Sequence, residues 1–402
     1  MKTVTLLFPL TQVLSTQAFQ LLVSSYKSEN TTVGALQTLE YSSGKNTSGL
    51  RITHTNTDCG SSPSWLELSS DGNTVTCINE GDPGSLTLLD VQCDGSLKML
   101  SNTSTLGGPV SGSFFNNGSA IGLAHYGPVP GVSTFTITSN KTYIPLQNLT
   151  APFANLSSVD PERQKTSHVH QALVDPTGQY MLFPDLGADL IHVYCINAST
   201  AQLSAHTPLK SEPGSGPRHA VFWQPTQPAA NRTTYLFVVH ELSNTIASYA
   251  VTYLSPSGLA FDPVDQVSTF GPTAAPRGAA AGEILISPDN AFVLASNRLA
   301  PLFHVPNPDP RNATALQSDS LVTFAPSATG SLRFVQLVAS GGLGPRHFSL
   351  RGDGAMVAVA NQGSASVVVY ERDQGTGEIG REVVRASGVG AGGVTNVRWL
   401  RG

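Results

Sequence analysis

Apolar positions in this chain form short runs separated by turn residues, most clearly over residues 168–196. Runs of this length, bounded by Gly, Pro, Asn and Asp, are typical of β-strands joined by tight turns. The pattern predicts strands over 168–174, 179–184 and 190–196, with turns at 175–178 and 185–189. No helical periodicity competes with this interpretation.

The same three-strand pattern returns along most of the chain. Further copies cover 63–93, 109–137, 217–251, 282–324 and 345–370, the copy at 109–137 being degenerate. Each copy is too small to bury both of its faces alone. Strand sets that recur every 40–70 residues or so indicate the blades of a β-propeller.

The two ends of the chain supply one more blade. Residues 394–400 resemble a first strand with nothing after it, whereas residues 19–54 offer three strands with nothing before them. Joining the ends closes the ring and removes its exposed sheet edges. We therefore expect one all-β domain over 19–402, a seven-bladed β-propeller. Two stacked β-sandwiches are the alternative, but they do not explain the recurring turns.

The composition of the chain indicates which partners it is unsuited to, and its N-terminal residues indicate its compartment. Charged residues are only 12% of the chain and the net charge is −5, which makes nucleic acid and anionic membranes poor partners. Residues 1–18 carry Lys2, an apolar run through Leu14 and a small residue at Ala18, as in a secretory signal peptide too short to span a bilayer. The sequence predicts a secreted, extracellular protein, with a monomer favoured.

Glycosylation and cysteine usage fit export. N-linked glycans are expected at ten Asn-x-Ser/Thr sequons, namely Asn30, Asn46, Asn102, Asn117, Asn140, Asn148, Asn155, Asn197, Asn231 and Asn312. Cys59, Cys77, Cys93 and Cys195 should form one or two disulfides, with three connectivities possible if all four pair. A cysteine metal site is a weak alternative, because no Cys-x-x-Cys motif occurs and because Cys93 and Cys195 fall at matching places in their blades, where packing explains them. We expect no metal and no cofactor.

Polar residues collect at two recurring places. In a propeller, the starts of first strands and the ends of second strands open onto one funnel. The first-strand starts carry His168, His170, Arg218, His219, Glu283, Arg346 and His347. The second-strand ends carry Glu80, His125, Asp185, Glu241, Arg298 and Asn361. Polar groups that converge in a concave site predict an active site.

Structural roles are open for several of these residues. Asp185 and Asn361 also suit Asx turns, which is the commoner role of Asp and Asn at a tight turn. The repeated Gly-Pro-Arg-His, which contains Arg218 and Arg346, equally suits a structural blade-entry motif. His168 and His170, however, should place both rings on the same face of a strand, which favours a functional pair.

At these residues the chain resembles the seven-bladed lactonase propellers, which include bacterial 6-phosphogluconolactonases of propeller type and fungal carboxy-cis,cis-muconate lactonizing enzymes. The resemblance covers essentially all of 19–402 and is strongest around 168–180, 185–194, 214–223, 240–249, 280–289 and 344–354. It implies catalytic roles for His168 or His170, Arg218, Glu241 and Arg298. Substrate-binding roles are then expected for Glu80, Asp185, His219, Glu283, Arg346, His347 and Asn361.

These residue types suit the opening or closing of a lactone. A histidine serves as base, arginines bind an oxyanion or a substrate carboxylate, and Glu241 orients the base or acts as an acid/base itself. No Gly-x-Ser-x-Gly motif occurs, so direct water attack or cycloisomerisation is favoured over an acyl-enzyme. The expected partner is a sugar-derived or carboxylated lactone.

Two other functions are compatible with the sequence. A non-catalytic secreted or wall-associated propeller would use the funnel or its rim for binding. A calcium-dependent lactonase would need several oxygen ligands, for which Glu80, Asp185, Glu241 and Glu283 are candidates, but the neighbouring arginines disfavour a bound cation.

Overall fold

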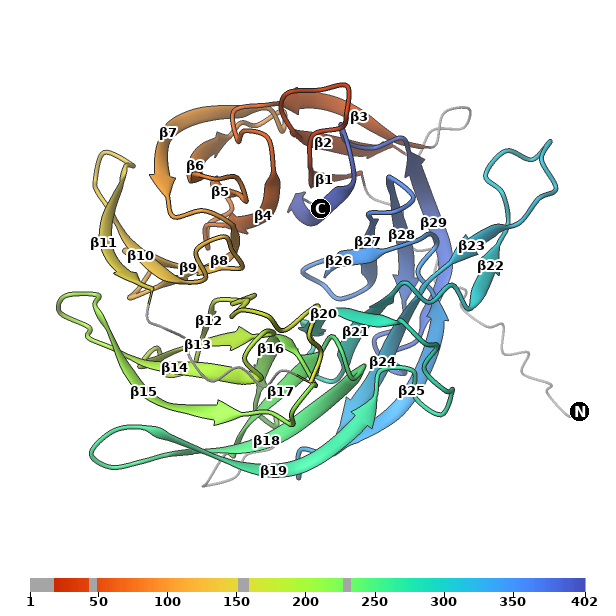
Figure 1. The fold of residues 1–402 in the computed structure, drawn as a ribbon. Helices are drawn as coiled ribbons and strands as arrows, with labels where there is room; N and C mark the ends of the chain where they lie inside the picture. The colour runs from red at the N-terminus through yellow and green to blue at the C-terminus, as the bar shows by residue number, and fades with distance from the viewer. Residues whose placement is uncertain (1–17, 43–48, 151–158, 227–232, 402) are drawn as a thin grey trace, which may run out of the picture.

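A computed structural model describes residues 18–42, 49–150, 159–226 and 233–401, which form a ring of seven four-stranded antiparallel sheets (Figure 1). The sheets surround a central channel, with one strand of each next to it and one strand on the outside. The predicted seven-bladed β-propeller is therefore confirmed. The proposed signal peptide, residues 1–18, lies almost entirely outside the described residues.

The blades follow one another in chain order. The first three after the N-terminal strands are β4 (Pro63–Leu68), β5 (Thr74–Asn79), β6 (Gly84–Val91) and β7 (Leu97–Thr105); β8 (Pro109–Phe115), β9 (Ala120–His125), β10 (Gly131–Ile137) and β11 (Tyr143–Leu149); and β12 (Leu173–Val174), β13 (Tyr180–Asp185), β14 (Leu190–Ile196) and β15 (Leu203–Lys210). The next three are β16 (Pro217–Trp223), β17 (Thr234–His240), β18 (Thr245–Tyr253) and β19 (Leu259–Ser268); β20 (Ala280–Ile286), β21 (Val293–Arg298), β24 (Ser320–Pro326) and β25 (Leu332–Ala339); and β26 (Pro345–Leu350), β27 (Met356–Asn361), β28 (Ser366–Arg372) and β29 (Ile379–Ser387).

The two chain ends meet in the remaining blade, as expected. Its strand order is β3 (Gly49–Asn56), β2 (Ala35–Ser42), β1 (Phe19–Ser25) and β30 (Val394–Arg401). Val23 pairs with Val397, and Leu21 pairs with Trp399. The Trp399 ring lies 5.0 Å from the Phe19 ring, and its Nε1 donates to the carbonyl oxygen of Ser349 at 3.1 Å. The C-terminal strand thus joins its own blade to the preceding one.

Two features depart from the predicted strands. The strand expected over 168–174 is reduced to β12, because the only β-bridge of residues 168–172 is Val169 to Asp185. A two-stranded hairpin, β22 (Phe303–Val305) with β23 (Leu316–Ser318), is inserted between β21 and β24 and projects from the ring (Figure 1).

The apolar core lies between neighbouring blades. One cluster, for example, contains Phe237 of β17, Val293 of β21 and Phe324 of β24, all of them at most 1% exposed. A disulfide links Cys59, which precedes β4, to Cys77 on β5, so one of the possible cysteine pairs forms. Within the described residues, no helix is long and apolar enough to cross a membrane.

Candidate active site

A β-bulge at the start of the inner strands turns polar side chains into the channel. The strand pairing shifts register between Pro217 and His219 in β16 and between Pro345 and His347 in β26. Equivalent shifts occur in β4, β8 and β20. A bulge leaves a residue unpaired and re-aims its side chain, and here the bulged residues are Arg218 and Arg346.

In each blade the second strand ends beside the start of the first strand, and these strand ends add further side chains to the channel. The residue that pairs with the first-strand start is buried in six blades, with an exposure between 0% and 8%: Asn79, His125, Asp185, His240, Asn297 and Asn361. The residue that follows it faces the channel in four blades: Glu80, Tyr126, Glu241 and Arg298.

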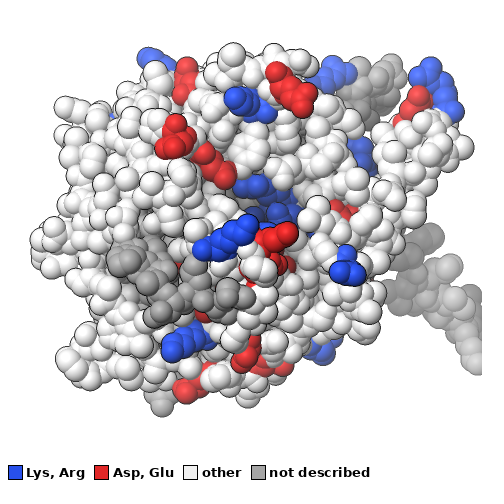
Figure 2. All heavy atoms as spheres, in the orientation of Figure 1, with Lys and Arg blue, Asp and Glu red and all other residues white. Residues whose placement is uncertain are grey.

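Together these side chains line a cavity of about 240 Å³ in the funnel. Its lining is Glu80, Val110, Tyr126, Arg163, His170, Glu241, Arg298 and Arg346. A narrower space adjoins it, bordered by His170, Arg218, His219, Glu283, Arg346 and His347 among others. Figure 2 shows basic side chains gathered in the hollow at the middle of this face, with acidic side chains at its edge.

Glu241 is surrounded by three arginines. Its Oε2 lies 3.0 Å from Arg218 Nε and 2.7 Å from Arg298 Nη2, and its Oε1 accepts from Arg163 Nη2. Burial alone would raise the pKa of Glu241, but Arg298 and Arg218 outweigh burial and lower it to about 2. The carboxylate is therefore ionised and fixes the arginines around the cavity. Arg218 is further held by a 2.9 Å hydrogen bond to the Gly282 carbonyl.

Arg346 has its own acidic partner. Its Nη2 lies 3.7 Å from Glu80 Oε2, and its guanidinium sits 5.3 Å from the centre of the Tyr26 ring. The Tyr26 hydroxyl donates to Glu80. Arg346 is thereby held against one wall of the cavity.

The histidines form a chain of contacts below the arginines. His170 Nδ1 lies 3.1 Å from His219 Nε2, and His219 Nδ1 lies 2.7 Å from Glu283 Oε1. His347 Nε2 lies 3.8 Å from the other oxygen of Glu283. Burial, and then the charge of Arg218, hold the pKa of His170 well below its usual value, so His170 is neutral at pH 7. A neutral imidazole at the cavity wall can accept a proton.

The structure therefore brings together most of the residues singled out from the sequence. His170, Arg218, Glu241 and Arg298 converge in one funnel, and Glu80, His219, Glu283, Arg346 and His347 surround them. The roles assigned to these residues stay predictions.

Three of the predicted residues border neither space. His168 stacks on Tyr126 with ring centres 4.1 Å apart and donates from Nδ1 to the Tyr126 carbonyl oxygen at 2.8 Å. Asp185 accepts from the backbone N–H of His168 at 2.7 Å and pairs with His192. Asn361 donates to the Ser340 carbonyl at 3.1 Å. Of the two histidines in the His-x-His pair, His170 is the one in the site.

Sequence reasoning missed two of the polar residues that line the cavity, Tyr126 and Arg163. Tyr126 follows His125 at the same place where Glu241 follows His240, so a strict alignment of the blades would have found it. Arg163 lies in the segment between β11 and β12, outside the repeat, and no repeating signal marks it.

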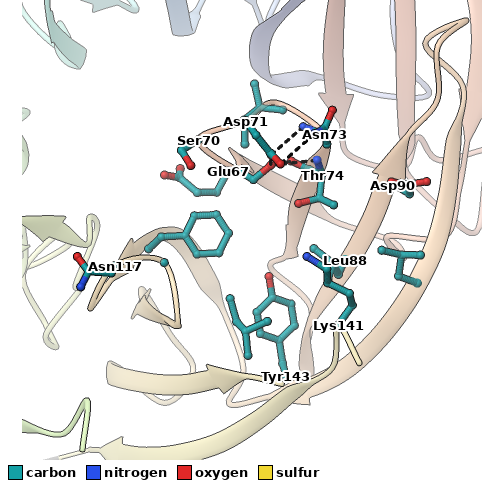
Figure 3. A pocket seen from close by; sticks show the side chains of 16 residues that line it. Glu67, Ser70, Asp71, Asn73, Thr74, Leu88, Asp90, Asn117, Lys141 and Tyr143 are labelled. Carbon is teal, nitrogen blue, oxygen red and sulfur yellow. Dashed lines mark hydrogen bonds between the residues drawn. The ribbon is translucent and has the colours of Figure 1, made fainter. Parts of the chain in front are cut away.

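A larger hollow of about 970 Å³ lies elsewhere, between the blades of β4 and β8 at the ends of these strands remote from the funnel (Figure 3). Two of its carboxylates accept hydrogen bonds from nearby side chains. Asp71 accepts from Ser69 and from Asn73, and Glu67 accepts from Trp65 Nε1 at 3.0 Å. The converging arginines, carboxylates and histidine that suit catalysis lie instead in the smaller cavity. Within the described part of the chain, no group of three His, Cys, Asp or Glu residues is placed to hold a metal ion.

Comparison with known proteins agrees with this architecture. A family model described as "Lactonase, 7-bladed beta-propeller" matches residues 20–395. A probable 6-phosphogluconolactonase of Arthroderma benhamiae is 32% identical over 336 residues, or 83% of this chain and 79% of the relative. The solved structure of a periplasmic gluconolactonase of Pseudomonas aeruginosa gives a TM-score of 0.75 at 25% identity, covering 95% of this chain and 99% of the other. The chain belongs to the seven-bladed β-propeller lactonase family.

Proposed function

We propose that the protein is a secreted lactonase that hydrolyses a sugar-derived or carboxylated lactone. The observation that carries this proposal is the cavity in which neutral His170 faces a surplus of positive charge. Across the cavity and the adjoining space, the arginines Arg163, Arg218, Arg298 and Arg346 outnumber the carboxylates Glu80, Glu241 and Glu283. Such a site suits a neutral base acting on a substrate that is, or becomes, an anion.

In the proposed reaction His170 takes a proton from a water molecule, and the resulting hydroxide adds to the lactone carbonyl carbon. Arg298 and Arg346 stabilise the developing oxyanion with charged N–H donors. The ring C–O bond then breaks, and His170 returns the proton to the leaving oxygen. The product is a hydroxy acid, whose carboxylate suits the same arginines.

Several observations support a sugar-derived substrate and secretion. Relatives are described as 6-phosphogluconolactonases and one solved neighbour as a periplasmic gluconolactonase. The seven sequon asparagines in the described residues are all exposed: Asn30, Asn102, Asn117, Asn140, Asn148, Asn197 and Asn312. The Cys59–Cys77 disulfide suits an oxidising compartment. Asn46, Asn155 and Asn231 lie outside the described residues.

Activity against a lactone panel tests the proposal. Gluconolactone, 6-phosphogluconolactone and carboxymuconolactone are offered to the purified protein, and acid release is followed by pH-stat titration. His170→Gln should lower kcat by about 10²–10⁴-fold, the usual contribution of a general base. Arg218 is a poor test position, because its side chain is only 2% exposed and its loss would also destabilise the fold.

The matched control is His304→Gln, an exposed histidine on β22, which should keep wild-type turnover. No hydrolysis of any lactone by the wild-type protein would reject the proposal and favour a non-catalytic binding propeller. Lactone formation from a muconate, without net hydrolysis, would instead identify a cycloisomerase.

A further inference from the structure

We propose that Glu283 and His219 are positioning residues for His170. They fix the tautomer that leaves Nε2 of His170 bare toward the cavity, and they carry the positive charge when His170 takes up a proton. This inference rests on the proposed lactonase function and adds an acidic group and a second histidine to it.

Glu283 is a buried carboxylate with a fixed direction of hydrogen bonding. Burial would raise its pKa, but His219 and then His347 outweigh burial and lower it to about 2. An ionised carboxylate only accepts hydrogen bonds. His219 Nδ1, at 2.7 Å from Glu283 Oε1, must therefore carry the hydrogen.

The proton on Nδ1 of His219 determines the tautomer of His170. Burial lowers the pKa of His219, so its ring is neutral and its Nε2 holds a lone pair. His170 Nδ1 lies 3.1 Å from this lone pair. Two lone pairs would repel, so His170 Nδ1 carries a hydrogen and donates it. The bare nitrogen of His170 is then Nε2, which has no hydrogen-bond partner among the described residues, and the ring borders the cavity.

The surroundings keep Glu283 charged and its partners in place. The backbone N–H of Val397 donates to His347 Nδ1 at 3.3 Å, so the hydrogen of neutral His347 is on Nε2, which faces Glu283 Oε2 at 3.8 Å. The Trp65 ring packs edge-on against His219 and His347, with centres 5.7 and 5.4 Å apart. Both imidazoles thus present N–H groups to one carboxylate.

This chain explains how a buried histidine can work as a base. When Nε2 of His170 takes a proton from water, the Nδ1 proton can move to His219 Nε2, and the new imidazolium is then in direct contact with Glu283. The proton moves back when His170 protonates the leaving oxygen. A carboxylate that orients an imidazole and stabilises its charged form plays the same part in serine hydrolase triads. The charged or titratable groups that share the cavity and the adjoining space with His170 are Glu80, Tyr126, Arg163, Arg218, His219, Glu241, Glu283, Arg298, Arg346 and His347.

Glu283→Gln tests the inference, because it keeps the shape and removes the charge. Turnover of the best lactone should fall about 10²–10³-fold in kcat, with KM changed less than about threefold. The acid limb of the kcat profile should move to lower pH, because without the Glu283 charge protonated His170 is less stable. Glu382→Gln, a carboxylate on outer strand β29 paired with Arg385, is the matched control and should change neither value.

A second readout does not depend on turnover. In the wild-type protein, ¹⁵N NMR of the imidazoles should show His170 with a protonated Nδ1 and a bare Nε2. His219→Gln should keep this tautomer, since a glutamine oxygen still accepts from Nδ1, but should lose turnover because an amide takes up no proton. This variant also serves if Glu283→Gln fails to fold.

The outcomes separate the two proposals. If no lactone is hydrolysed but His170 shows the expected tautomer, the proposed function fails and the positioning role stands. If lactone is hydrolysed and His170 carries its proton on Nε2, the positioning role is wrong. A Glu283→Gln variant that loses turnover with an unmoved acid limb would likewise show that Glu283 only supports the fold.

Discussion

At the residue scale, the arginines of the funnel depend on a few ionised carboxylates. Burial, and then the charge of Arg298, lower the pKa of Arg218 to about 9, which still leaves Arg218 charged at neutral pH. Glu241 opposes this shift by contacting Arg163, Arg218 and Arg298 at once. A buried cluster of like charges without such a partner would be costly. The surplus arginine charge that suits an anionic substrate therefore exists because Glu241 is present.

Leu299 provides a test at the same scale. It follows Arg298, has a positive φ of 59°, and its side chain is 67% exposed. Leucine is strained in this conformation by roughly 1–2 kcal/mol, whereas glycine is not. We expect Leu299→Gly to leave the free energy of unfolding unchanged or to raise it slightly. Leu299→Val should lower it by about 1 kcal/mol, because a β-branched residue fits positive φ poorly.

Guanidine denaturation of both variants checks this pair. Leu299→Val should lower the free energy of unfolding, whereas Leu299→Gly should not. Two equal losses would mean that contacts of the leucine side chain, and not its backbone conformation, decide stability there.

The sequence predicted which residues converge, and the roles assigned to them stay predictions. It placed His170, Arg218, Glu241 and Arg298 in one funnel, since strand starts and strand ends can be recognised from turn residues. It could not separate Asp185 from Glu241, because a shift of one position decides whether a side chain closes the blade or faces the cavity. The alternation of inward-facing and outward-facing residues is interrupted at the turn, so the sequence does not show which residue there faces the cavity.

At the scale of elements, the β-bulges at the starts of the inner strands give each of five blades a position from which a side chain can enter the channel. The same shift in strand pairing occurs in β4, β8, β16, β20 and β26. Only two of these strands place an arginine at the bulge, so the repeat supplies the position and the individual blade supplies the chemistry. The β22–β23 hairpin escaped prediction because it interrupts the repeat with strands of three residues, too short to give a clear pattern.

The C-terminal strand β30 should be essential for the stability of the ring. It is the innermost strand of the closing blade, and its Trp399 contacts both Phe19 and Ser349. Deletion of 394–402 should destabilise the whole ring by more than about 3 kcal/mol, because it removes a packed tryptophan and exposes the edge of β1. A single, cooperative melting transition at lower temperature is expected by calorimetry.

Trp399→Phe is the graded control for the deletion. It keeps an aromatic ring against Phe19 but loses the hydrogen bond to Ser349, which costs about 1 kcal/mol, and part of the packing of the indole ring. An unchanged melting temperature after the deletion would contradict the view that the chain ends hold each other.

At the scale of the whole molecule, the ring is what makes the site. Glu241 and Arg298 are 57 residues apart, His219 and Glu283 are 64 apart, and Arg163 and Glu241 are 78 apart. These contacts form only when separate blades are fixed around one channel. The sequence thus predicts the blades from local patterns, whereas distances such as His170 to His219 depend on closure of the ring and lie beyond a local pattern.

Closure also buries titratable groups, which predicts acid sensitivity. Burial lowers the pKa of His125 and His240 to about 4 and that of His347 to about 3. The unfolded chain therefore binds protons at these histidines at a higher pH than the folded protein does. Their contribution to stability is complete above about pH 6.5 and is lost as the pH falls towards 4, by up to about 1.4 kcal/mol per pH unit for each histidine.

The carboxylates extend the loss to lower pH. Glu241 and Glu283 have folded pKa values of about 2, below their ordinary 4.5, so their contribution is present above pH 4.5 and is lost between there and pH 2. Guanidine midpoints measured from pH 7.5 to 4 should first fall near pH 6.5 and then more steeply below 4.5.

His240→Asn tests how much one buried histidine contributes to this loss of stability with falling pH. Between about pH 6 and 4.5 the variant should lose stability less steeply than the wild type, by up to about 1.4 kcal/mol per pH unit, because one proton is removed from the linkage. His304→Gln, on the exposed hairpin, should keep the wild-type slope. Because His240 lies at the end of β17, directly before Glu241, an equal slope in both variants would mean that acid acts on the ring elsewhere than at these strand ends.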